Sequence, residues 1–488
     1  MMPPGDITDF EGGLHDAGQL AQFKIGINYA EAKLIRFMKG ENKVINDSAV
    51  FWSRILTEVT LSFHIIYATI GVGVPILIMI AQWIGIKNND EHYILMARRW
   101  ARGFVITVAV GVVTGTVIGL QLSLLWPNFM QMAGQLIALP LFLETFAFFF
   151  EAIFLGIYLY TWDRFENQKK HMLLLIPVAI GASMSSVFIT VLNAFMNAPQ
   201  GFDIVDGQVI NIQPLVAMFN PAMPTKVAHV LLTAYMTCAF LLASIAAYRL
   251  LRGSKHEYHK KSLYLLMKLG FIFAVATAIV GDFSGKYLAE YQPEKLAAAE
   301  WHFETEPNAP LILFGVLDDG EIKYALKIPY ALSILAHSNP TAEVIGLDKF
   351  PVDEHPPYYI HYLFDGMVMI GMFMVALSLL YLLALWRGWA FIQTKWFRWI
   401  VVAGGPLSVI AIELGWWLAE VGRQPWLLRG IMRTEQGATT SEYVDLMLIL
   451  FSALYFVLAM GSIITLHRMF KKNPIENEIA RRKERDVI

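Results

Sequence analysis

Nine long apolar stretches are the feature of this sequence that most restricts its fold. Each holds roughly 20 residues or more, the length that a helix needs to cross the hydrocarbon core of a bilayer. They run at about 56–84, 102–126, 137–161, 172–196, 227–248, 262–281, 358–386, 398–419 and 442–467. The sequence therefore predicts an all-α membrane protein with nine transmembrane helices.

The composition agrees with a membrane protein and excludes several other classes. Of the 488 residues, 56% are hydrophobic and only 16% are charged, which is too apolar for an ordinary soluble domain. The formal net charge of -2 predicts no nucleic-acid partner. Cys238 is the single cysteine, so no intrachain disulfide and no cysteine-based zinc or iron–sulfur site can form.

The charges of the loops predict an orientation. The loops after the first, third, fifth and seventh stretches are basic, for example "YRLLRGSKHEYHKK", so the positive-inside rule places the N-terminus outside and the C-terminus in the cytoplasm. The basic N-terminal tail disagrees, but its pattern "AEAKLIRFMKG" is typical of an interfacial amphipathic helix. We therefore expect an N-terminal extension over 1–51, a membrane domain over 52–468 and a cytoplasmic tail over 469–488.

Ionisable side chains within the apolar stretches are candidate functional residues, because a charge in hydrocarbon is costly. These side chains are Glu58, His64, Glu144, Glu151, His229, Asp365 and Glu413. With Met367, the two histidines and Glu413 fall in the outer half of the membrane in the predicted orientation. Haem iron accepts histidine, methionine and other axial ligands. A membrane histidine can instead hydrogen-bond a neighbouring helix, and a methionine commonly serves packing alone.

Two acids in the third stretch share one helix face. Glu144 and Glu151 are seven residues apart, so their carboxyls lie one above the other. This spacing fits a proton relay at mid-membrane, and it also fits two acids that bond to neighbouring helices.

Several motifs resemble the large haem-bearing subunit, subunit I, of cytochrome bd-type quinol oxidases. They are "VGRQPW" at 421–426 with "ELGWWLAE" before it, "GDFSGKYLAEYQPEKLAAAEW" at 281–301, "YTWDRF" at 160–165, "PLFLE" at 140–144 and "IPYALSILA" at 328–336. The resemblance covers roughly residues 52–468 and includes all nine stretches.

The resemblance implies the ligands of three haems. His229 and Met367 match the axial pair of a low-spin haem b. His64 and Glu413 match ligands of two high-spin haems, one haem b and one haem d, and the family does not fix which residue serves which macrocycle. A haem partner would explain why Glu413 lies in an apolar helix.

The resemblance also implies roles at the outer face. Gln292, Lys295 and Glu300 match residues associated with quinol oxidation, while Arg423 and Trp426 would fix haem propionates and packing. The composition of "EKLAAAE" favours a helix on which Gln292 and Lys295 share a face and Glu300 lies about 140° from Lys295. A charged helix on a wet surface would show the same pattern.

The implied activity is that of a terminal respiratory oxidase in the cytoplasmic membrane of a prokaryote. Quinol would be oxidised at an outer loop over 282–357, and electrons would pass through the low-spin haem to the high-spin pair, where oxygen is reduced to water. Protons would come from the cytoplasm past Glu151 and Glu144, so that proton motive force arises without pumping. The implied partners are a second membrane subunit, subunit II, and small single-span subunits.

Two departures from the family pattern keep other functions open. Gly119 stands where a glutamate is common, and Asp365 stands where an arginine is usual. Both permit a bd-like oxidoreductase with another electron donor, such as a cytochrome c. A non-catalytic haem-binding sensor would need no proton path, so Glu144 and Glu151 argue against that class. A transporter would show broken helices in paired halves, and the sequence shows no such symmetry.

Overall fold

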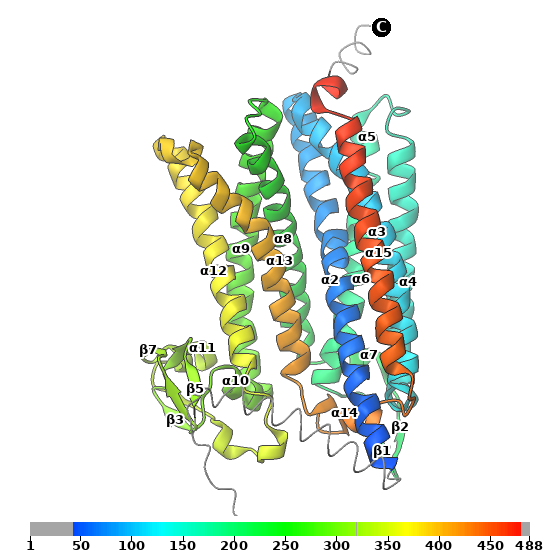
Figure 1. Ribbon diagram of the computed structural model, residues 1–488, viewed down its shortest axis with the longest axis vertical. Coiled ribbons are helices and arrows are strands. Elements are labelled where there is room, and N and C mark those ends of the chain that lie inside the picture. The colour runs from blue at the N-terminus through cyan, green and yellow to red at the C-terminus, as the bar shows by residue number, and fades with distance from the viewer. Residues whose placement is uncertain (1–41, 319, 480–488) are drawn as a thin grey trace, which may run out of the picture.

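The computed structural model describes residues 42–318 and 320–479, and within these ranges nine helices are long and apolar enough to cross a membrane (Figure 1). They are α2 (Asn42–Asn88), α3 (Glu91–Leu125), α4 (Pro127–Tyr160), α6 (Leu175–Asn197), α8 (Met223–Leu251), α9 (Glu257–Tyr291), α12 (Ile360–Arg387), α13 (Lys395–Val421) and α15 (Val444–Lys472). The predicted nine-helix membrane fold is confirmed. Most of the predicted interfacial N-terminal helix lies outside the described residues.

Several helices extend beyond the apolar stretches that predicted them. Helix α2 begins at Asn42 and so runs through the predicted boundary at residue 51. Helix α4 begins at Pro127, ten residues before the predicted start, because proline is well suited to the first turn of a helix. Helix α9 continues to Tyr291 rather than 281, and an ion pair between Asp282 and Lys286, four residues apart, supports its added turns.

The helices form two neighbouring groups (Figure 1). Helices α8, α9, α12 and α13 pack together on one side, and α2, α3, α4, α6 and α15 stand on the other. The groups meet where α2 packs against α8. A side chain at Gly73 of α2 would place its Cβ 2.5 Å from the Sγ atom of Cys238 on α8, so glycine is needed for this close approach.

The connections at one end of the bundle hold most of the non-helical structure. Between α9 and α12 lie α10 (Pro293–Ala299), α11 (Ala331–His337), η1 (Leu347–Lys349), η2 (Val352–Glu354) and the strands β3 (Glu306–Pro307), β4 (Leu311–Leu313), β5 (Val316–Asp318), β6 (Glu321–Lys323), β7 (Leu326–Ile328) and β8 (Glu343–Val344). Antiparallel pairs join β3 to β8, β4 to β7 and β5 to β6. We call this the loop end of the bundle (Figure 1).

Shorter elements complete the chain. They are α5 (Gln168–Met172), α7 (Pro214–Met218), η3 (Ala390–Gln393), α14 (Thr434–Gly437) and the antiparallel pairs β1 (Asp203–Val205) with β2 (Gln208–Ile210) and β9 (Trp426–Leu428) with β10 (Met432–Arg433). Pair β1–β2 and helix α14 lie at the loop end, while the described chain ends at the opposite end (Figure 1).

Candidate functional site

Three of the predicted haem ligands lie at the same level of the bundle. His229 is six residues from the start of α8, Met367 is seven residues from the start of α12, and Glu413 is eight residues from the end of α13. All three of these termini are at the loop end, so each side chain lies roughly 10 Å along its helix from that end. The fold therefore brings these residues to one depth.

The hydrogen bond of His64 leaves one ring nitrogen available to a metal. Its Nδ1 atom lies 2.8 Å from the hydroxyl of Thr114 on α3. That hydroxyl donates its own proton to a carbonyl of α3, at 3.0 Å from the oxygen of Val110. When the hydroxyl donates to Val110 it accepts from Nδ1, and the lone pair of the imidazole is then on Nε2, where it could bind an iron.

Two other predicted ligands carry buried polar atoms with no hydrogen bond of normal geometry to the described chain. These atoms are Nδ1 of His229 and both carboxylate oxygens of Glu413, although the Ser62 hydroxyl lies beside Glu413. Buried polar atoms are ordinarily paired, and exceptions need an explanation. Over the described ranges, no group of three or more His, Cys, Asp and Glu side chains could hold a bare metal ion. Isolated ligands of this kind fit a haem, whose macrocycle supplies most of the iron ligands itself.

The sulfur of Met367 occupies a space that a glycine keeps open. A Cβ atom at Gly415 of α13 would lie 3.0 Å from the Sδ atom of Met367. A Cβ atom at Gly115 of α3 would likewise lie 3.3 Å from the ring of His64. Both ligand side chains therefore depend on a glycine in the neighbouring helix.

A basic cluster surrounds the end of α13. Arg423 is buried, and its Nη2 atom donates to Glu420 at 2.7 Å, while its Nε and Nη1 atoms have no partner within the described ranges. Asn193 of α6 also donates to Glu420 and accepts from the Nζ atom of Lys226 at 2.9 Å. Lys295 lies nearby, and the two nitrogen atoms of Arg423 without a partner in the described chain suit an added anionic group such as a haem propionate.

Lys295 belongs to this basic cluster and is not on a wet surface. It lies on α10, its side chain is buried, and its Nζ atom donates to the carbonyl of Ala419 at 3.1 Å. Burial, and then the positive charge of Arg423, lowers the pKa of Lys295 to about 7. Its amine can therefore gain or lose a proton near neutral pH.

Glu300, at the end of the same helix, is also buried. It follows the last residue of α10 and is 0% exposed. Neither carboxyl oxygen makes a hydrogen bond of normal geometry within the described chain, and the backbone N–H of Ile312 lies beside them. Burial, and then the charge of Asp365, raises the pKa of Glu300 to about 8.

The residue after Glu300 has a strained backbone. Trp301 has a φ angle of 49°, a left-handed conformation that costs a bulky residue about 1–3 kcal/mol. Its ring is buried, its Nε1 atom donates to the carbonyl of Tyr358 at 2.8 Å, and it stacks on His361 with ring centroids 4.0 Å apart. These contacts hold the strained segment in place.

The two remaining predicted residues of the outer face make structural contacts. Gln292 joins α9 to α10, and its Nε2 atom donates to the carbonyl of Asn197 at 2.9 Å. Trp426 lies on β9, where the guanidinium of Arg433 is 5.3 Å from its ring centroid. The structure thus places Gln292 against α6 and gives Trp426 a basic neighbour other than Arg423.

Glu144 and Glu151 both face α6, as their spacing predicted. The Ser185 hydroxyl of α6 donates to Glu144 at 2.8 Å. A Cβ atom at Gly181 of the same helix would lie 2.9 Å from the backbone nitrogen of Glu151, whose side chain is buried. Glu144 therefore bonds to a neighbouring helix, and the proton path remains a prediction.

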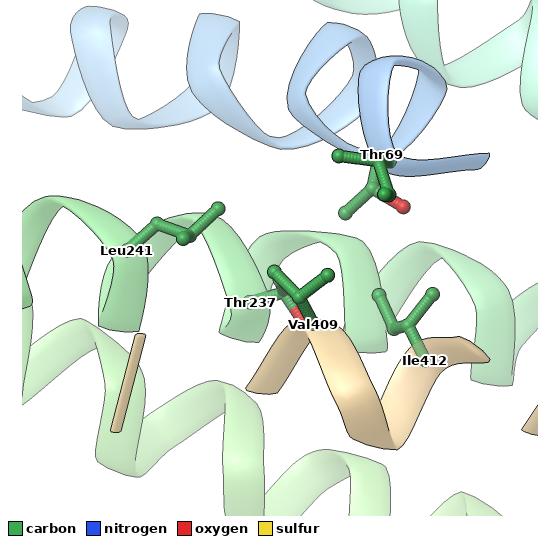
Figure 2. A pocket seen from close by; sticks show the side chains of 6 residues that line it. Thr69, Thr237, Leu241, Val409 and Ile412 are labelled. Atoms are coloured by element: carbon green, nitrogen blue, oxygen red, sulfur yellow. The ribbon is translucent and has the colours of Figure 1, made fainter. Parts of the chain in front are cut away.

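A small space lies between α2, α8 and α13, one turn from Glu413 (Figure 2). It is lined by Ile66, Thr69, Thr237, Leu241, Val409 and Ile412, and it has no room for a water-sized sphere. The space is therefore far too small for a macrocycle. The haem assignments depend on the ligand side chains and not on this space.

Sequence reasoning missed two polar groups near the site. Lys226 of α8 lies one residue before the predicted start of its span, so it did not count as intramembrane. His361 is four residues before Asp365 on α12 and is fully buried, with its Nε2 atom 3.5 Å from Oδ2 of Asp365. The His-x3-Asp spacing within an apolar helix was the signal that could have revealed this pair.

Comparison with known proteins finds one family over most of the chain. The family model "Cytochrome bd terminal oxidase subunit I" matches residues 52–474. A putative cytochrome bd menaquinol oxidase subunit I of Bacillus subtilis is 40% identical over 438 residues, which are 88% of this chain and 98% of that protein. A cytochrome bd ubiquinol oxidase subunit 1 of the same organism is 30% identical over 445 residues, with 87% and 94% covered. A chain of the solved bd oxidase from Geobacillus thermodenitrificans is 70% identical, with 87% of this chain and 99% of that chain covered and a TM-score of 0.85.

Proposed function

The chain belongs to the cytochrome bd terminal oxidase subunit I family, and from this premise we propose that it oxidises quinol at its loop end and supports oxygen reduction deeper in the bundle. As a member of this family it is a multi-pass cell membrane protein of a haem-binding respiratory oxidoreductase. The finer proposal concerns which residues hold the haems, the quinol and the protons.

The proposed haem ligands are His229 with Met367 for a low-spin haem b, and His64 and Glu413 for two high-spin haems, one b and one d. The His229 nitrogen and Glu413 carboxylate oxygens without a partner in the described chain, and the glycines beside Met367 and His64, support this proposal. When bound, the haems supply electron transfer and the reduction of oxygen to water. Arg423 would bind a propionate through the two nitrogen atoms that have no partner in the described chain.

The proposed quinol site lies beside Lys295 and Glu300, and the burial of Glu300 is the observation that carries this proposal. A charged helix on a wet surface would leave this carboxyl solvated, yet it is 0% exposed. A carboxyl held without ordinary partners can accept a hydroxyl proton from a substrate that reaches it. Lys295 would then bind the second oxygen of the quinol or take its proton.

Glu151 and Glu144 are the proposed carriers of protons from the end opposite the loop. Their common face toward α6 supports this role. Since the quinol would release its protons at the loop end and oxygen reduction would draw protons from the other end, charge is separated without a pump.

A protein donor such as a cytochrome c is the weaker candidate. The substitution of Asp365 for the usual arginine permitted it, and docking of a basic protein donor would need an exposed carboxylate. Asp365 is buried, however, and its Oδ2 atom accepts from the backbone N–H of Phe314 at 2.6 Å. It therefore offers no docking surface, and a member of the homologous group is named a menaquinol oxidase.

Replacing Glu300 by Gln tests the proposal. We expect E300Q to lower quinol-driven oxygen consumption by roughly a hundredfold, because a positioned acid or base contributes on this scale. An artificial donor that reduces the haems without the loop should still support turnover. Glu304, an exposed acid in the same loop, provides the matched control E304Q. Equal losses with both donors would place the defect at the haems or in folding, and no loss with either would contradict the quinol assignment.

The pH dependence provides a second readout of the same variant. Only the ionised carboxyl accepts a proton, so the active fraction of Glu300 rises as pH rises through its pKa of about 8. We expect the quinol oxidation rate of the unmodified enzyme to show a rising limb near pH 8, and this limb should be missing in E300Q. A limb that persists unchanged in E300Q would remove Glu300 from the role of base.

A further inference from the structure

His361 contacts both chain neighbours of Glu300. Its Nδ1 atom lies 2.8 Å from the carbonyl oxygen of Ala299, the residue before Glu300. Its ring stacks on Trp301, the residue after Glu300, at 4.0 Å between centroids and 23° between planes. The side chain of His361 is itself 0% exposed. The backbone on both sides of the proposed base therefore rests on one buried histidine of α12.

The same ring also joins the loop to α12. Its Nε2 atom lies 3.1 Å from the carbonyl oxygen of Phe314, and the N–H of Phe314 donates to Asp365 at 2.6 Å. Phe314 follows β4, whose Ile312 lies beside the Glu300 carboxyl. One residue of the loop is thus held to α12 at both its carbonyl and its amide group.

The surroundings of the His361 ring fix its position. Each ring nitrogen lies within hydrogen-bond distance of a carbonyl oxygen of the loop, and the Nε2 atom is also 3.5 Å from Oδ2 of Asp365. The Trp301 ring stacks on the face of the imidazole. The geometry therefore ties the ring to the loop at several points.

We propose that His361 is a positioning residue for Glu300: its ring ties Ala299, Trp301 and Phe314 to α12 and so holds the carboxyl of Glu300 where the quinol hydroxyl arrives. This inference rests on the proposed function of Glu300 as the proton acceptor. His361 touches neither substrate nor haem in this scheme, and it acts only through the residue that it holds.

The direct test is His361→Phe, which keeps an aromatic ring to stack on Trp301 and removes both hydrogen bonds to the loop. We expect kcat/KM for quinol to fall between roughly tenfold and a hundredfold, the range typical of a misplaced reacting group. Turnover with a donor that bypasses the loop, and the low-spin haem spectrum, should be unchanged. His355→Phe is the control, because that loop histidine bonds to Leu347, Phe350 and Tyr358 and not directly to the chain neighbours of Glu300.

A double variant distinguishes positioning from a general structural role. If His361 acts through Glu300, the H361F change should cost little in a chain that already carries E300Q. A protease added at the outer face should also cleave the loop faster in H361F than in H355F, since the tie to α12 is lost. His361→Gln, which retains a donor, should lie between H361F and the unmodified enzyme.

Each outcome has a clear meaning. Losses that multiply in the double variant would show that His361 acts independently of Glu300 and would overturn the inference. Unchanged quinol kinetics in H361F, with a normal loss in E300Q, would overturn the inference alone and leave the proposed function intact. A loss with both donors in H361F would show a folding defect and would likewise contradict a role restricted to Glu300. No loss in E300Q itself would overturn the proposed function and this inference together.

Discussion

At the end of the bundle opposite the loop, Glu478 forms ion pairs with Arg99 and Arg102, whereas the carboxyls of Glu300 and Glu413 at the loop end have no such pairing within the described chain. The paired side chains of Arg99 and Glu478 are only 8% and 9% exposed. Near that end, Asp90 also accepts from Lys261 at 2.5 Å. Both ends therefore contain ion pairs, but the loop end also buries two carboxyls, those of Glu300 and Glu413, that have no basic partner within the described chain.

This difference between the two ends predicts that substitutions at one end affect stability and substitutions at the other affect chemistry. In a buried ion pair the attraction between the two charges offsets much of their desolvation cost, while a buried polar atom without a partner costs about 1–3 kcal/mol. A fold keeps such unpaired atoms where another molecule completes them, as at ligand and catalytic sites. We therefore expect substitutions at the loop end to impair chemistry with little effect on stability, and substitutions at the opposite end to do the reverse.

The largest effect on chemistry is expected for Met367→Leu. Leucine keeps the volume, so the free energy of unfolding should change by less than about 1.5 kcal/mol. Loss of the thioether should remove the low-spin signal or shift its reduction potential by on the order of 0.1 V, since axial ligands set haem potentials over about 0.8 V. A redox titration of the purified oxidase measures this. Met372→Leu, an exposed position of the same helix, is the control, and an unchanged spectrum and potential in M367L would refute the ligand assignment.

A smaller effect is expected for Glu151→Leu. Removing the acid should slow oxygen consumption by roughly a hundredfold, because a proton carrier can contribute on this scale. The low-spin haem should still be reduced by quinol, which stopped-flow absorption can follow separately from turnover. Thr145→Leu on the exposed side of α4 is the matched control, because its hydroxyl donates to the carbonyl of Leu141 in its own helix. If E151L turns over at the unmodified rate, the acid serves helix packing.

The smallest effect on chemistry is expected for Glu478→Gln. This change leaves the cations of Arg99 and Arg102 without their carboxylate and should cost about 3 kcal/mol of stability. Thermal unfolding of the purified oxidase measures the loss, while turnover below the transition should stay normal. The exposed neighbour Glu476 gives the control E476Q, with a change within about 0.5 kcal/mol. A turnover defect in E478Q at full stability would break the contrast between the two ends.

Length and apolar content were enough to predict the nine helices, but not where they end. The start of α4 depends on Pro127, and the end of α9 depends on the ion pair between Asp282 and Lys286. Polar composition alone would assign both segments to loops. Helix α10 was predicted correctly from "EKLAAAE". The burial of Lys295 was not predicted, because it depends on how the loop folds against α13.

The candidate ligands could be predicted because each is an unusual residue within an apolar stretch. Their partners could not be predicted in this way. His361 contacts Ala299 and Phe314, which are 62 and 47 residues away in the sequence, through a loop fold that no local pattern encodes. The tautomer of His64 likewise depends on Thr114 of another helix.

A substitution at Gly415 would have opposite effects on the thermal stability of α13 and on the position of the Met367 sulfur. Glycine inside a helix costs roughly 1 kcal/mol relative to alanine, so a screen for thermal tolerance alone would favour Gly415→Ala in α13. The added methyl group would lie 3.0 Å from the sulfur of Met367 and would push it aside. Selection for thermal stability alone would therefore also move the sulfur atom that we propose tunes the electron-transfer potential. A stability assay would not detect this change.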